Sequence, residues 1–210
     1  ELGEDYMRAG LLDRAEALFD DLVAMDAHAP SALRHLIAIY QHERDWHKAI
    51  DHARRLEAMT GESQGATIAQ FYCELAEQSR AHGARAEARA SLEQSFASEP
   101  HCVRSHMIAG HLRAEDGDHS GAVESFEHAV RADIDFVPEI LPPLLDNYAR
   151  SQQMDRAEKF LVDVIDRYQG ISPVLALMRL YAGREGERAA VDFLTRQLRQ
   201  RPSVRGLMAL

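Results

Sequence analysis

The chain has 210 residues and a formal net charge of −10, from 24 Lys and Arg against 34 Asp and Glu. An apolar content of 46% is too high for a disordered chain, and the acidic balance argues against general nucleic-acid binding, which needs clustered basic residues. Two cysteines cannot make a disulfide scaffold, and no run of residues approaches the roughly 18 apolar residues of a membrane span.

A small residue recurs along the chain and is followed four positions later by a bulky residue in most cases. The recurring residues are Ala15, Ala49, Ala88, Ala122, Ala157 and Ala190. Their successive spacings are 34, 39, 34, 35 and 33 residues. A period of about 34 residues is that of the tetratricopeptide repeat, a helix–turn–helix unit. The sequence therefore predicts an all-α tetratricopeptide-repeat solenoid of about six units, wound as a right-handed superhelix.

The predicted helix pairs follow one another as a single array, with turns expected near Gly10, Gly83 and Gly117. The units are expected at about residues 1–30, 31–63, 66–101, 103–135, 138–170 and 172–202. Proline is tolerated only in the first turn of a helix, so the first helix of the fifth unit is predicted to start at about Pro142 or to be kinked there. Residues 203–210 predict the start of a further helix that is cut short. An apolar terminal repeat without a polar cap makes homo-oligomerisation a further expectation.

The segment Asp116–Gly121, followed by Glu127, matches the ligand spacing of an EF-hand calcium loop. Gly117 also falls at the predicted turn of the fourth unit, where Ala122 and Phe126 are packing residues. A calcium loop would have to unwind the helix that carries them. The repeat turn is therefore the favoured interpretation, and a calcium site is the alternative.

Cys102 and His106 are spaced so that they could share a helix face, which offers a second metal alternative. No His-Glu-x-x-His or Cys-x-x-Cys motif supports it. Packed helices lie ~8–10 Å apart, whereas a disulfide needs Cα atoms at ~6 Å. We therefore expect free thiols at Cys73 and Cys102, and neither a metal nor a cofactor in this chain. No phosphate-binding loop or nucleophile elbow is present either, so the sequence predicts a protein that is not an enzyme.

First helices of such stacks line a concave face that can bind a peptide or a partner domain. Arginine is enriched in binding hot spots and pairs well with carboxylates. A carboxylate clamp of the kind that grips chaperone C-termini is disfavoured, because Glu4, Ala38 and Glu77 stand where Lys and Asn are needed. The candidate partner-binding residues, placed by register, are Arg34, Gln41, Glu77, Arg80, Arg104, Met107, His111, Asp146, Arg150 and Arg179, and Cys73 is expected on the same face.

Several segments resemble the cytoplasmic region of the lipopolysaccharide assembly protein B family. They are Leu2–Leu11 with Asp13–Glu16, Ile39–Gln41 with Trp46–Asp51, Ile68–Ala76, and Thr195–Leu198 with Arg201–Pro202. The part Phe71–Ala76 is the most specific, because the repeat pattern does not demand it. The resemblance implies a Gram-negative inner-membrane protein with one membrane helix before the repeats and a rubredoxin-like module with two Cys-x-x-Cys pairs after them.

The same resemblance implies an adaptor that helps an FtsH-type membrane protease degrade the deacetylase of the lipid A pathway, and so restrains lipopolysaccharide synthesis. The chain begins with Glu1 and has neither the membrane helix nor a Cys-x-x-Cys pair. We therefore expect an excised, soluble piece of a protein at the cytoplasmic face of the inner membrane. A substrate-recruiting arm of a larger enzyme and a generic peptide-binding or oligomerisation module are the alternatives.

Overall fold

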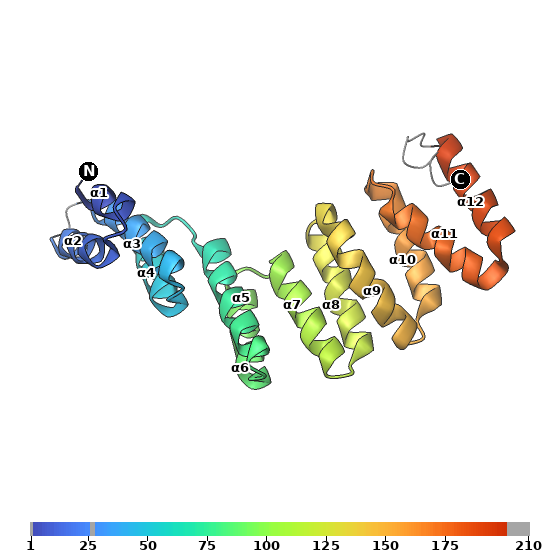
Figure 1. Cartoon of the computed structure of the whole chain (residues 1–210), viewed down its shortest axis with the longest axis horizontal. Coiled ribbons are helices and arrows are strands. Elements are labelled where there is room, and N and C mark those ends of the chain that lie inside the picture. The colour runs from blue at the N-terminus through green and yellow to red at the C-terminus, as the bar shows by residue number, and fades with distance from the viewer. Residues whose placement is uncertain (1, 26–27, 201–210) are drawn as a thin grey trace. The chain divides into compact units, whose positions relative to one another are not determined.

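The computed structural model of the chain describes residues 2–25 and 28–200, which form α-helices, one short 3-10 helix and connecting turns (Figure 1). No residue in these ranges lies in a β-strand, as the all-α expectation requires. The α-helices are α1 (Leu2–Arg8), α2 (Leu12–Ala24), α3 (Ala29–Glu43), α4 (Trp46–Thr60), α5 (Gly65–Ala81), α6 (Arg85–Ser98), α7 (Val103–Glu115), α8 (His119–Ala132), α9 (Val137–Arg150), α10 (Met154–Arg167), α11 (Ser172–Glu185) and α12 (Glu187–Gln200), and the 3-10 helix Ile134–Phe136 precedes α9.

The chain divides into two compact units, residues 1–108 and 109–210, and the boundary falls inside α7. The core of the first unit is built from apolar side chains of α2 to α5, among them Phe19, Leu33, Leu36, Ile50 and Phe71. The core of the second includes Phe126, Ile140, Leu144, Leu161 and Leu177. The single array and its right-handed superhelix stay predictions, and the helix expected from residue 203 lies outside the described residues.

The small residues that define the repeat register are buried on the second helix of each pair. The exposed fraction is at most 3% for Ala15, Ala49, Ala88, Ala122, Ala157 and Ala190. The bulky residues four positions later are also buried at Phe19, Leu92, Phe126 and Leu161. A larger side chain in place of any of these six alanines would push the paired helices apart. The predicted register is therefore confirmed.

The turn between the paired helices has the same backbone conformation in five pairs. The residue five positions before the buried alanine has a positive φ at Gly10 (73°), Arg44 (61°), Gly83 (74°), Gly117 (81°) and Gln152 (58°). Glycine adopts this left-handed conformation without strain, whereas Arg44 and Gln152 adopt it at a cost of about 1 kcal/mol. The turns predicted near the three glycines are thus confirmed.

Two of the turns are also fixed by an aspartate that caps the following helix. The Asp45 side chain accepts a 3.2 Å hydrogen bond from the Lys48 amide at the start of α4. The Asp118 side chain accepts one of 2.9 Å from the Gly121 amide at the start of α8. Each cap satisfies an amide that has no partner within its own helix.

The prediction that a helix starts at about Pro142 is wrong, because α9 begins at Val137 and includes both Pro142 and Pro143. The alternative, a kink at Pro142, stays a prediction. Within a helix these prolines remove the hydrogen bonds that the carbonyls of Pro138 and Glu139 would accept. Pro138 and Glu139 are exposed, so water can take the place of the missing donors. Val137 and Ile140 in the same turns are buried, and their burial offsets the lost bonds.

Glycine permits a close approach of the two helices in two pairs. A Cβ atom on Gly110 of α7 would lie 2.7 Å from Cε1 of the Phe126 ring on α8. A Cβ atom on Gly3 of α1 would lie 2.5 Å from Cζ of Phe19 on α2. Both rings stand four residues after a buried register alanine, so each fills the space that its glycine leaves open.

Candidate functional site

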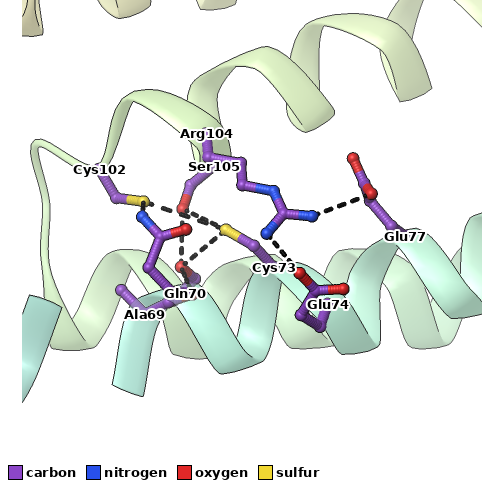
Figure 2. Close-up of polar contacts among 9 residues, drawn as sticks. Ala69, Gln70, Cys73, Glu74, Glu77, Cys102, Arg104 and Ser105 are labelled. Carbon is purple, nitrogen blue, oxygen red and sulfur yellow. Dashed lines mark hydrogen bonds and ion pairs between the residues drawn. The ribbon is translucent and has the colours of Figure 1, made fainter. Parts of the chain in front are cut away.

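An arginine held between two glutamates joins α7 to α5 (Figure 2). Arg104, in the first turn of α7, donates from Nη1 to Oε1 of Glu74 at 2.6 Å and from Nη2 to Oε2 of Glu77 at 3.0 Å. Glu74 and Glu77 are three residues apart on α5 and therefore share one face of that helix. The structure thus brings together two of the predicted partner-binding residues, Glu77 and Arg104.

The charge of Arg104 is stabilised in this position. Partial burial on its own would lower the pKa of the guanidinium, but the hydrogen bonds and negative charges of Glu74 and Glu77 outweigh burial and raise the pKa of Arg104 above its usual value. The side chains of Arg104, Glu74 and Glu77 are 33%, 35% and 42% exposed. The cluster is therefore accessible from solvent and is charged at neutral pH.

Two other arginines of the predicted face are also paired with carboxylates. Nη2 of Arg34 on α3 lies 3.4 Å from Oε2 of Glu62. Nε of Arg150 lies 2.8 Å from Oδ2 of Asp146, one turn earlier on α9. A carboxylate of a partner would therefore have to replace a carboxylate that is already present at each of these arginines.

The remaining predicted residues are distributed over both compact units. In the first unit, Gln41 is exposed near the end of α3, and Arg80 and Met107 are half-buried on α5 and α7. In the second, His111 packs edge-on against the Phe126 ring with 5.1 Å between centroids, and Arg179 is exposed on α11. Contact of any of these residues with a partner stays a prediction.

A buried cluster of thiols and hydroxyls lies beside the Arg104 cluster (Figure 2). The sulfur atoms of Cys73 on α5 and Cys102, the residue before α7, are 4.0 Å apart. The Ser105 hydroxyl lies 3.2 Å from the Cys73 sulfur and 2.6 Å from the hydroxyl of Ser95 on α6. Ser95 in turn donates to the carbonyl of Ala69 at 2.9 Å. The prediction of free thiols is confirmed for both cysteines.

The two thiols are in different electrostatic environments. The hydrogen bond from the Cys73 thiol lowers the pKa of Cys102, and the Ser105 hydroxyl and the backbone amides of Arg104 and Ser105 lower it further. The same thiol–thiol hydrogen bond, together with burial, raises the pKa of Cys73. Cys102 is thus the thiol that ionises first.

Sequence reasoning missed Glu74 of the Arg104 cluster, and it missed Ser95 and Ser105 beside the two thiols. Glu74 could have been found, because it lies in Phe71–Ala76, the segment that the repeat pattern does not demand. Ser95 and Ser105 are three residues from the buried Leu92 and Ile108, at helix positions where an apolar side chain is expected. A small polar residue at such a position is a signal for a buried hydrogen bond.

A hydrogen bond from a tyrosine to a glutamate joins neighbouring repeats at two places in the chain. The Tyr40 hydroxyl on α3 donates to Glu16 Oε1 on α2 at 2.6 Å, and Lys48 Nζ on α4 lies 3.4 Å from the same oxygen. In the second compact unit, Tyr148 on α9 donates to Glu127 Oε1 on α8 at 2.6 Å, and Nε of Arg156 on α10 donates to that oxygen at 2.7 Å.

The Glu127 carboxylate is a structural group. It also accepts a hydrogen bond from Nη2 of Arg131, at 2.5 Å, and its side chain is 3% exposed. Burial would raise the pKa of Glu127, but hydrogen bonds from Arg156 and Tyr148 and the charges of Arg156 and Arg131 outweigh burial, so the pKa lies below the usual value of 4.5.

The calcium-loop alternative does not fit this geometry. Residues 119–127 belong to α8, Asp118 caps that helix, and Glu127 is committed to two arginines and a tyrosine. The His106 ring packs against Phe96 with 4.8 Å between centroids, and its Nε2 lies 3.2 Å from the Pro100 carbonyl. Among the described residues, no group of three or more His, Cys, Asp or Glu side chains is placed to hold a metal ion.

None of the helices within residues 2–25 and 28–200 combines the length and the apolar character needed to cross a bilayer.

The tetratricopeptide-repeat family matches residues 1–63 and 74–135. The C-terminal part of a repeat-containing protein from Cytophaga hutchinsonii is similar in structure, with a TM-score of 0.53 and 12% identity, covering 94% of this chain and 77% of that chain. This structural similarity shows the fold alone.

Lipopolysaccharide assembly protein B of Escherichia coli (strain K12) is 34% identical over 205 residues, which cover 98% of this chain and 53% of that protein. The protein of the same name from Haemophilus influenzae is 32% identical over 203 residues, which cover 97% of this chain and 51% of that protein. The predicted resemblance is therefore confirmed. The chain spans about half the length of the curated relatives it matches.

Proposed function

Because this chain belongs to the tetratricopeptide-repeat family, we propose that it is a protein–protein interaction adaptor that acts in lipopolysaccharide assembly. The similarity to lipopolysaccharide assembly protein B over 98% of the chain is the observation that carries the proposal. Stacked helix pairs of this kind offer their first helices to peptides and partner domains. The role is one of binding and needs no catalytic group.

The finer proposal concerns the partners. The parent protein brings an FtsH-type membrane protease and the deacetylase of the lipid A pathway together at the cytoplasmic face of the bacterial inner membrane. Holding both on one scaffold raises the effective concentration of the substrate at the protease, and proteolysis then restrains lipopolysaccharide synthesis.

Arg104 is the residue through which we expect a partner to bind. Its ion pairs with Glu74 and Glu77 are partly solvated, and such pairs contribute about 1 kcal/mol or less each. An acidic group of a partner can therefore replace one of the glutamates at small cost. The guanidinium fork then forms a bidentate contact with the incoming carboxylate.

Affinity capture of both partners on the intact parent protein tests the proposal. The wild-type parent should retain the protease and the deacetylase, and Arg104→Glu should weaken retention of at least one about tenfold, or by about 1.4 kcal/mol. The matched control is Arg167→Glu on α10, the second helix of its pair, where the arginine is exposed and pairs with Asp163, one turn earlier. Failure of the wild-type parent to retain either partner would overturn the proposal. Equal retention by the two variants would exclude Arg104 from the binding surface.

A further inference from the structure

Cys73 and Cys102 form an isolated pair of thiols inside the first compact unit, and the adaptor role does not use them. Their sulfur atoms are 4.0 Å apart, and the exposed fractions of the two residues are 0% and 6%. Cys102 lies outside both α5 and α7 because it is the residue before α7 begins. The separation of packed helix axes therefore does not limit how closely Cys102 can approach Cys73.

The surroundings of Cys102 suit an ionised sulfur. The Gln70 amide nitrogen lies 3.6 Å from its sulfur, and the backbone amides of Arg104 and Ser105, at the N-terminus of α7, lower the pKa of Cys102. Amides and the positive end of a helix dipole stabilise a thiolate, which is the nucleophilic form of cysteine. Cys73, by contrast, is fully buried and is surrounded by hydroxyl groups, including that of Ser105.

We propose that Cys73 and Cys102 are a peroxide-reactive dithiol, in which Cys102 is oxidised first and Cys73 then closes a reversible disulfide between α5 and the segment that leads into α7. The oxidant is hydrogen peroxide, which is small enough to reach the slightly exposed Cys102. The chain contains no other cysteine, so no other thiol competes for the oxidised sulfur.

The chemistry balances in two steps. The Cys102 thiolate attacks one peroxide oxygen, the O–O bond breaks, the sulfur becomes a sulfenic acid, and the departing hydroxide takes up a proton to form water. The Cys73 sulfur then attacks the sulfenic sulfur, the S–O bond breaks, and the hydroxide combines with the Cys73 proton as a second water. In sum the two thiols lose two electrons and two protons, and the peroxide is reduced to two molecules of water.

The disulfide would cross-link two segments that also carry the Arg104 cluster. Cys73 precedes Glu74 on α5, and Cys102 lies two residues before Arg104. The sulfur atoms must move closer together to form the bond, since a disulfide is about 2 Å long. The residue before a helix can adjust its backbone more freely than a residue inside one, so Cys102 is the partner that moves.

The test uses the purified chain exposed to hydrogen peroxide, then denatured and treated with an alkylating reagent. The wild type should lose both alkylatable thiols and two hydrogen atoms of mass, and dithiothreitol should restore them. In Cys73→Ser the reaction should stop at a sulfenic acid on Cys102 that dimedone traps. In Cys102→Ser the remaining Cys73 should stay alkylatable under the same exposure.

The wild-type mass measurement decides the question even where a variant fails to fold. Retention of both thiols after exposure would overturn the proposal, and so would disulfide-linked dimers in place of an internal bond. Equal reaction of the two single variants with peroxide would overturn the assignment of Cys102 as the residue that is oxidised first.

Discussion

The buried carboxylate of Glu127 on α8 accepts a 2.6 Å hydrogen bond from the hydroxyl of Tyr148 on α9. Tyr148 is fully buried, so its hydroxyl has no access to water. Two arginines, Arg131 and Arg156, bind the same carboxylate from the solvent side, where each is about half exposed. The arrangement predicts how the fold responds when the carboxylate is removed.

Glu127→Ala should lower the free energy of unfolding by about 2 kcal/mol, because the Tyr148 hydroxyl is then left buried without an acceptor. The arginines contribute less to the loss, since water can solvate them. Urea denaturation followed by circular dichroism measures the change. The control is Asp163→Ala, which removes the exposed ion pair with Arg167 within α10 and should change the free energy by less than about 0.5 kcal/mol. Equal effects of the two substitutions would contradict the structural role of Glu127.

The lowered pKa of Glu127 predicts a pH dependence of stability. A carboxyl whose pKa is lower in the folded than in the unfolded chain stabilises the fold above the unfolded value, and this contribution is lost as the pH falls through the folded value. Wild type should therefore exceed Glu127→Gln in stability at neutral pH. The difference should shrink as the pH is lowered below the usual value of 4.5. Denaturation midpoints of both proteins from pH 7 to pH 3 measure it, and a constant difference would refute this account.

Gly110→Ala should destabilise the protein by about 1–3 kcal/mol, because the added methyl group overlaps the Phe126 ring and a buried ring cannot move away freely. Gly183→Ala, at a position of α11 where a Cβ has no neighbour within 4 Å, is the matched control. It should raise stability by about 0.5–1 kcal/mol through helix propensity alone. Thermal unfolding compares the two variants, and destabilisation by both would mean that the ring contact is not the cause.

Pro142→Ala should stabilise the protein by about 1–3 kcal/mol, because it restores a helical amide inside α9 that can donate to the Pro138 carbonyl. Pro138→Ala is the control, since Pro138 lies in the first turn, where the amide has no partner within the helix. Its effect should be close to zero. The difference between the two urea midpoints measures the prediction, and a neutral Pro142→Ala would contradict it.

The all-α tetratricopeptide-repeat solenoid was predictable from the sequence because the register depends on residue size. A buried alanine such as Ala122 is required by the close approach of two helices, and that requirement recurs in every unit. The start of α9 was mispredicted for the opposite reason. The cost of Pro142 is local, whereas the burial of Val137 and Ile140 that offsets it depends on neighbouring helices.

The candidate site was predictable only in part. The register indicates which residues share a helix face, and so it identified Arg104 and Glu77. It does not indicate which side chains pair with each other, so the binding of Arg34 by Glu62 was missed. The proximity of the thiols was missed because Cys102 was expected inside a helix, and a shift of one residue past the helix start changes what its side chain can reach.

The contacts of Glu16 with Tyr40 and of Glu127 with Tyr148 have a consequence for how the protein unfolds. Each joins one repeat to the next along the chain. If a single repeat melted, its neighbour would keep a carboxylate or a tyrosine hydroxyl that has lost its hydrogen bond to the melted repeat, at a cost of about 1–3 kcal/mol. Partly unfolded states are therefore disfavoured, and these bonds make adjacent repeats melt cooperatively rather than one at a time.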